Sequence, residues 1–171
     1  SRNKARLVAM QALFQMDYGE DSLRRIVEVR GSEESLGERD HAYIDKVVRS
    51  VIENKDRIDE IITRFSIDWD LHRLGKVERA ILRLAIGEML FLKDVPVSVA
   101  INEAVRLAKK YGADNASKFV NGILGKFSRE ELGKDVSAAD PSGNSDDIDT
   151  ELDDESDIQD PEGETPVSDP G

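Results

Sequence analysis

The first residues of the chain, SRNKARLVAMQALFQM, combine basic and aromatic side chains and contain no acid within sixteen residues. On a helical wheel, Gln11, Phe14 and Tyr18 share one side, and Lys4 and Arg6 flank it. Such a set suits single-stranded nucleic acid, because cations contact phosphates, flat rings stack on bases and an amide reads base edges. The alternative is that Phe14 belongs to the core and that the cations form a solvated helix end.

A second unusual face lies near the end of the helical region, in SKFVNGILGKF. Lys118, Asn121, Gly122 and Gly125 would share one side of a helix there. Each glycine inside a helix costs about 1 kcal/mol relative to alanine, so something must approach the backbone closely. Either another helix packs against these glycines, or a ligand backbone lies along them.

Catalytic and metal chemistry is not indicated. His41 and Asp45 could face each other one helical turn apart, but no third ligand has suitable spacing. The segment DDIDTELDDESD has the acid density of a calcium loop without its central glycine or flanking helices. No phosphate-binding glycine loop or nucleophile motif is present, so we expect a binding module with no catalytic residues, metal or cofactor.

Helices must position these residues, since apolar side chains recur at three- to four-residue spacing almost throughout. The segment 77–92 is apolar nearly all round, which predicts a central helix surrounded by others. Ala5, Ala9 and Ala12 line one side of the first helix and allow close packing of a neighbour. Alternating strand patterns are absent, so the predicted class is all-α with short loops. The predicted helices cover residues 3–19, 22–31, 39–54, 55–66, 77–92, 99–112 and 114–132.

Charge divides the chain into two parts. Residues 1–132 hold 23 Lys+Arg and 22 Asp+Glu, a net charge of +1, whereas residues 133–171 hold 1 Lys and 14 acids, a net charge of −13. The second part has no aromatic residue and four of the five prolines. It cannot bury enough apolar surface to offset its ordering entropy, so we predict one domain over 1–132 and a disordered acidic tail over 133–171.

Composition and hydropathy bear on the cellular location. The chain has no cysteine, which fits the cytoplasm. The longest apolar stretch, 77–92, contains four charged residues and reads as a buried helix, not a membrane span. No signal-peptide core precedes it, so we expect a cytoplasmic protein without a membrane partner.

Three motifs carry a resemblance to a known family. WDLHRLGKVERAILRLAIGEMLF, then DVPVSVAINEAVRLAKKYG, then SKFVNGILGKF resemble the NusB family of transcription antitermination factors in order and spacing. KARLVAMQALFQMD is similar to that family's first helix, so the resemblance spans about residues 2–128. It implies a non-enzymatic domain of two packed three-helix-type bundles. It also implies binding of boxA-type ribosomal RNA leader sequence together with NusE, a ribosomal protein, and indirect association with NusA, NusG and RNA polymerase.

The resemblance also implies site residues. The RNA contacts would lie along the first helix and at the start of the last: Arg2, Lys4, Arg6, Gln11, Phe14, Tyr18, Asn115, Lys118 and Phe119. The NusE contacts would lie on the central helix: Glu78, Arg79, Arg83 and Glu88.

Two other functions fit a helical domain of this kind. RNA cytosine methyltransferases carry a similar accessory domain, although this chain has no motif for a methyl-donor site. A protein-only helical adaptor, with the acidic tail as its working part, is the other alternative.

Overall fold

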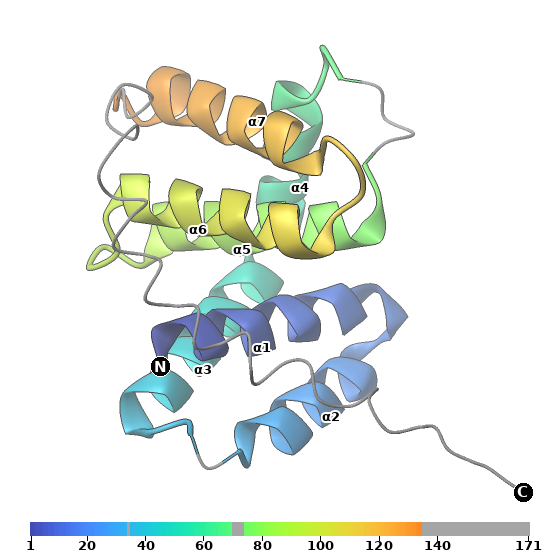
Figure 1. Ribbon diagram of the computed structural model, residues 1–171, viewed down its shortest axis with the longest axis vertical. Coiled ribbons are helices and arrows are strands. Elements are labelled where there is room, and N and C mark those ends of the chain that lie inside the picture. Colours follow the sequence, from blue (N-terminus) through green and yellow to red (C-terminus); the bar gives the residue numbers. More distant parts are fainter. Residues whose placement is uncertain (34, 70–73, 135–171) are drawn as a thin grey trace, which may run out of the picture. The chain divides into compact units, whose positions relative to one another are not determined.

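The protein is described here by a computed structural model that places residues 1–33, 35–69 and 74–134. Helices account for nearly all of this part of the chain, and it contains no β-strand. Figure 1 shows their arrangement. The elements are α1 (Arg2–Phe14), the 3-10 helix η1 (Gln15–Tyr18), α2 (Glu20–Gly31), α3 (Glu38–Glu53), α4 (Lys55–Phe65), α5 (Lys76–Phe91), α6 (Val97–Tyr111) and α7 (Ala116–Glu131).

Local signals in the sequence set several helix ends. The Ser1 hydroxyl accepts a hydrogen bond from the Lys4 amide and caps α1. Pro96 immediately precedes α6, as expected for a residue that fixes an extended entry. The predicted first helix over 3–19 differs in its last turn, because the chain tightens into η1 after Phe14.

The alanine side of α1 is buried, as predicted. Ala5, Ala9 and Ala12 have no exposed surface, and α1 packs against α2, α3 and α5. Small side chains let three neighbours approach one helix. The alanine side of α1 is therefore committed to the core.

The prediction of a central helix is confirmed for α5. It packs against α1, α3, α4, α6 and α7. Its approach to α3 is close at Gly87, where a Cβ would lie 2.6 Å from Cγ2 of Val51. A larger residue at this position would push the two helices apart.

The all-α class is confirmed. Helices α1, α2 and α3 pack as one group, and α4, α5, α6 and α7 as another, with α5 also contacting α1 and α3. In the described ranges, none of the helices combines the length and apolar character needed to cross a membrane.

The end of α7 uses two residues that composition assigns to the tail. Gly133 adopts a left-handed backbone with φ of +67°, and the Lys134 amide donates to the Ser128 carbonyl at 2.9 Å. The Ser128 hydroxyl donates in return to the Lys134 carbonyl at 2.6 Å. The rest of the predicted tail, including its calcium-loop-like segment, lies outside the described residues.

Candidate nucleic-acid interface

An exposed aromatic side chain with a cation beside it lies just after α1. Tyr18 is 54% exposed, and Nζ of Lys76 donates to its hydroxyl at 2.7 Å and lies 4.6 Å from the ring centroid. The hydrogen bond to Tyr18 raises the pKa of Lys76, so this ammonium stays charged. The half-buried ring of Phe14 lies 6.2 Å from that of Tyr18 at a tilt of 46°. Two rings and a cation are thus grouped where a base could stack.

The first turn of α5 joins this group to the loop between α6 and α7. Lys76 holds Tyr18, and two residues later the Glu78 carboxylate accepts a hydrogen bond from the Ala113 amide at 2.7 Å. In Figure 1 the end of α1 and the α6–α7 loop both lie at the right of the helical domain. Asn115 follows in that loop, exposed and with a left-handed φ of +67°. Lys118 is exposed on the first turn of α7.

The start of α7 corrects one expectation about an aromatic residue. Phe119 is only 3% exposed, and its ring packs against Trp69 at 5.7 Å between centroids. It is therefore a core residue in this structure and does not present a face to a base. Trp69 is half-buried and covers Gly122, where a Cβ would lie 2.9 Å from Cζ2 of the indole. Gly122 therefore makes room for the Trp69 indole. The close approach that the sequence predicted is made by this side chain and not by a neighbouring helix or a ligand backbone.

Sequence reasoning did not select Trp69 or Lys76. Trp69 precedes the central helix α5, and Lys76 is its first residue. Both lie outside the basic first segment and the glycine-containing last helix, where the sequence predicted a ligand. The available signal for Trp69 was the unexplained glycine at position 122, which required a partner of some kind. The signal for Lys76 was only its place at a helix start, which does not predict an aromatic partner.

The N-terminal end of α1 carries two further cations of the predicted RNA-binding set. The guanidinium of Arg2 lies 4.4 Å from the centroid of the Tyr43 ring. Nζ of Lys4 donates to the Ser35 hydroxyl at 2.9 Å. Both cations are partly exposed, so they can still face a phosphate. They lie about 20 Å of helix away from Tyr18, as thirteen residues of α1 require.

Arg6 is buried, which corrects the expectation that it flanks an exposed face. Its side chain is 6% exposed, and Nε donates to the Glu88 carboxylate at 2.9 Å. Burial disfavours its charge, but Glu88, Tyr43 and Glu103 together outweigh that effect and raise the pKa of Arg6. The Tyr43 hydroxyl donates to the same carboxylate, and burial followed by the charge of Glu88 raises the pKa of Tyr43 well above its usual range. Leu7 is 7% exposed, so it too belongs to the core.

Gln11 occupies an intermediate position. It is half-buried, and its amide oxygen accepts a hydrogen bond from Arg30 of α2. Its amide nitrogen remains as the group that could donate to a base. The side chain therefore fits the predicted face, with its orientation held from α2.

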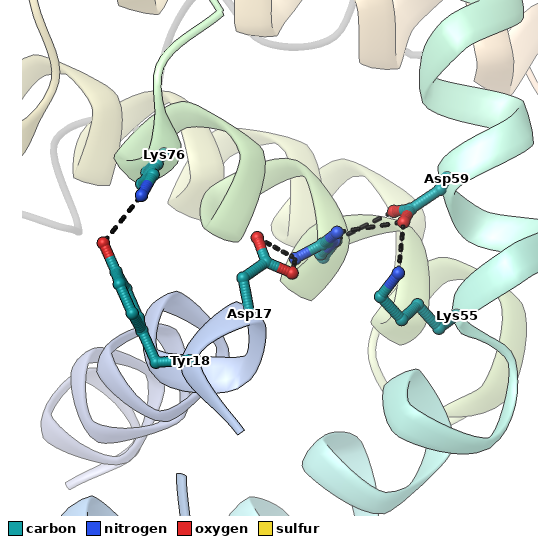
Figure 2. A network of polar contacts seen from close by, with 6 residues as sticks. Asp17, Tyr18, Lys55, Asp59 and Lys76 are labelled. Carbon is teal, nitrogen blue, oxygen red and sulfur yellow. Dashed lines mark hydrogen bonds and ion pairs between the residues drawn. The ribbon is translucent and has the colours of Figure 1, made fainter. Parts of the chain in front are cut away.

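A network of charges holds η1 against α5 and α4. Arg83 is buried and donates to Asp59 at 2.9 Å and to Asp17 at 3.3 Å. Lys55 contacts Asp59 at 3.2 Å, and Figure 2 shows this network beside the Tyr18–Lys76 pair. The carboxylate of Asp17 precedes Tyr18 directly. The network therefore fixes the backbone that presents the exposed tyrosine.

Metal ligands are not grouped in the described part of the chain, where no three His, Cys, Asp or Glu side chains come together. Asp45, which could have faced His41, instead pairs with Arg49 at 2.8 Å.

Comparison with known families matches residues 3–129 to the NusB family. The chain belongs to the NusB family. It is 45% identical to the transcription antitermination protein NusB of Alkaliphilus oremlandii over 131 residues, which cover 77% of this chain and 95% of that protein. It is 42% identical to the same protein of Bacillus subtilis over 123 residues, covering 72% and 91% of the two chains. Membership makes this chain a non-enzymatic transcription antitermination factor.

Solved NusB structures share the fold. The chain is similar to T. maritima NusB with a TM-score of 0.68 and 40% identity, over 76% of this chain and 92% of that one. It is also similar to a chain of a complex of the antitermination factors NusB and NusE with dsRNA, with a TM-score of 0.63 and 32% identity, over 75% and 96% of the two chains.

The charges expected to face NusE are largely internal in this NusB-family chain. Glu78, Arg83 and Glu88 are 3%, 4% and 1% exposed. Each has a partner within the chain, as described above. The expectation that these charges contact NusE stays a prediction, and three of the four are engaged within the chain. Arg79 is half-buried and remains the only one of the four with appreciable exposure, and all four lie within the described residues.

Proposed function

We propose that this chain binds single-stranded, boxA-like RNA together with the ribosomal protein NusE, and through that complex associates with NusA, NusG and RNA polymerase in the cytoplasm. One observation carries the RNA part of the proposal. The first turn of α5 holds Tyr18 beside Lys76 and, through Glu78, anchors the loop that leads to Asn115 and Lys118. Aromatic rings and cations from segments that are distant in the sequence thus lie close to the first turn of α5.

The chemistry of this group suits unpaired bases. The half-exposed Tyr18 offers a ring face on which a base can stack, and the exposed Lys76 and Lys118 offer positive charges to phosphates. Lys4 and Gln11 extend the same side along α1, and Arg2 adds a cation at the start of that helix. Arg6 and Phe119 are left out of the proposed face because they are buried.

The choice of partner follows from the relatives. A similar chain has been solved as NusB with NusE and RNA, and the antitermination proteins above are matched over nearly their whole length. We propose that the half-buried Arg79 is the residue of α5 that contributes to the NusE surface. The internal charges would support that surface from below by fixing α5.

Fluorescence anisotropy with labelled RNA tests the function directly. We expect the full chain to bind a boxA-containing single strand, and to bind it more tightly once NusE is added. A scrambled strand of equal length should bind less tightly in the presence of NusE. Equal affinity for both strands, with no effect of NusE, would contradict the proposal and favour a protein-only adaptor.

A further inference from the structure

A pocket of about 350 Å³ lies at the opposite end of α1 from Tyr18. It is bounded by the start of α1, by one face of α3 and by the turn that follows α5. Three cations line it together with one aromatic ring and one acid: Arg2, Arg39, Lys46, Tyr43 and Asp94. This composition differs from that of the core, so the pocket requires its own explanation.

The α3 side of the pocket is a single helical stripe. Arg39, Ala42, Tyr43 and Lys46 follow one another at the spacing that places residues on one face of a helix. Arg39 and Lys46 are exposed at the two ends of this stripe, and Ala42 leaves space between them. Two charged side chains therefore reach over the same small depression.

The floor of the pocket is a buried aromatic ring. The Tyr43 ring is 4% exposed, and its hydroxyl donates to the buried Glu88 carboxylate. The guanidinium of Arg2 lies over this ring at 4.4 Å. Nε of Arg2 is buried and has no hydrogen-bond partner among the described residues. A donor in that state is unsatisfied, so this part of the guanidinium is not neutralised by a neighbouring acceptor.

The charge of the pocket is not cancelled internally. Within the part of the chain that the structure describes, neither Arg39 nor Lys46 forms an ion pair, although Arg49 on the same helix pairs with Asp45. Asp94 supplies one negative charge against three positive ones. The pocket is therefore suited to an anion with several acceptor oxygens, for which guanidinium groups are good donors.

We propose that this pocket binds one backbone phosphate of the RNA, as an anchor for the strand at the end of α1 remote from Tyr18. The inference rests on the proposed function, since it gives the same strand a second point of attachment. Lys4 and Gln11 lie on the same side of α1 as Tyr18, and Arg2 lies on the opposite side, so a strand that joins the two ends would cross the first turn of α1. A single strand that follows α1 would bring a phosphate to each end, which an isolated carboxylate of a protein partner would not do.

Two pairs of variants test the anchor. Arg39→Gln with Lys46→Gln removes both exposed charges, and Arg39→Lys with Lys46→Arg keeps them. We expect the first pair to weaken RNA binding about three- to tenfold at low salt and to reduce the log–log salt slope by about 0.7, the value for one phosphate of a single strand. The charge-preserving pair should retain the wild-type slope. Arg25→Gln with Arg57→Gln, two exposed cations on α2 and α4, controls for net charge.

RNA length provides an independent readout. Shortening the strand one nucleotide at a time should reach a length at which wild type and the Arg39→Gln, Lys46→Gln variant bind equally, because the strand no longer spans both ends of α1. Thermal unfolding verifies that each variant is folded. Wild-type affinity and slope in the glutamine pair, at every strand length, would overturn the anchor and leave the proposed function standing. Failure of the wild type to bind RNA at all would overturn both.

Discussion

Arg6 and Glu88 face each other across α1 and α5 with 2.9 Å between Nε and the carboxylate oxygen, and their side chains are 6% and 1% exposed. Sequence reasoning assigned one of them to RNA and the other to NusE. The structure joins them in one internal pair, with the Tyr43 hydroxyl as a further donor. Their charges thus hold the two helices that carry the candidate interface.

Removing either member of this pair should destabilise the fold. We expect Arg6→Met or Glu88→Leu to lower the free energy of unfolding by about 3–5 kcal/mol, because each leaves a buried charge without its partner. The double variant should cost less than the sum of the two. Urea unfolding of all four proteins measures this, and strictly additive losses would show that the two charges do not interact.

Glu78 and Arg79 should separate stability from partner binding. Glu78→Lys removes the acceptor of the Ala113 amide and places a cation in a buried position, so we expect a loss of stability of at least about 1–3 kcal/mol. Arg79→Glu changes a half-buried position and should leave stability nearly unchanged while weakening NusE binding. Urea unfolding and calorimetry with NusE give the two readouts. A stable Glu78→Lys protein with weakened NusE binding would reverse these assignments.

Acid should remove the contribution of Asp59. Burial alone would raise the pKa of this carboxyl, but the hydrogen bond and charge of Arg83, with those of Lys55, lower it below its ordinary value. The stabilisation is therefore present above about pH 4 and is lost as pH falls through the lower folded-state pKa. We expect Asp59→Asn to be less stable than wild type by about 1–3 kcal/mol at pH 7, with the difference shrinking below pH 4.

The control for that titration is Asp56→Asn, an exposed position in the first turn of the same helix. It should change stability by less than about 1 kcal/mol. Urea unfolding at successive pH values compares the three proteins. A difference between wild type and Asp59→Asn that stays constant down to pH 2 would contradict the assigned direction of the shift.

Tyr18 should contribute stacking, and Lys76 charge, to RNA affinity. Tyr18→Ala should lose about 1–3 kcal/mol of binding with little change in salt slope, whereas Tyr18→Phe, which keeps the ring, should lose much less. Lys76→Ala should reduce the slope by about 0.7. Anisotropy across a salt series distinguishes them. Equal affinity of Tyr18→Ala and wild type would remove the tyrosine from the interface.

The acidic tail should compete with RNA for the cations of the domain. A chain ending at Lys134 keeps the residues that cap α7 and lacks all 14 acids of the tail. We expect it to unfold at the same midpoint as the full chain and to bind RNA more tightly at low salt, with the two affinities converging as salt screens the charges. Superimposable affinities across the salt series would show that the tail does not reach the interface.

The helices were largely predictable from spacing, and the fate of individual side chains was not. Periodicity identified α5 as central and the alanines of α1 as buried, since both depend on patterns repeated over several turns. Arg6 looks like an exposed cation because its partner, Glu88, is 82 residues away. A helical wheel of one segment carries no information about a charge that another segment supplies.

The same limit applies to the site. Tyr18 was predictable as a ring beside cations, but the cation that contacts it, Lys76, comes from another helix. Phe119 matched the aromatic pattern and is buried beneath Trp69. Pairings across long sequence distances decided which aromatic residues are exposed. Those pairings follow from the packing of whole helices, which one sequence does not specify.

The position of α5 has a consequence for how the protein loses its structure. Neighbours from both helix groups surround this helix, so neither group can open without exposing part of it to water. Its backbone amides should therefore exchange with deuterium only when the whole domain unfolds, at the rate set by the global free energy. The peripheral α2, by contrast, can detach and exchange locally. The partition of the helices into two groups describes packing, while the unit of cooperative unfolding is the entire set.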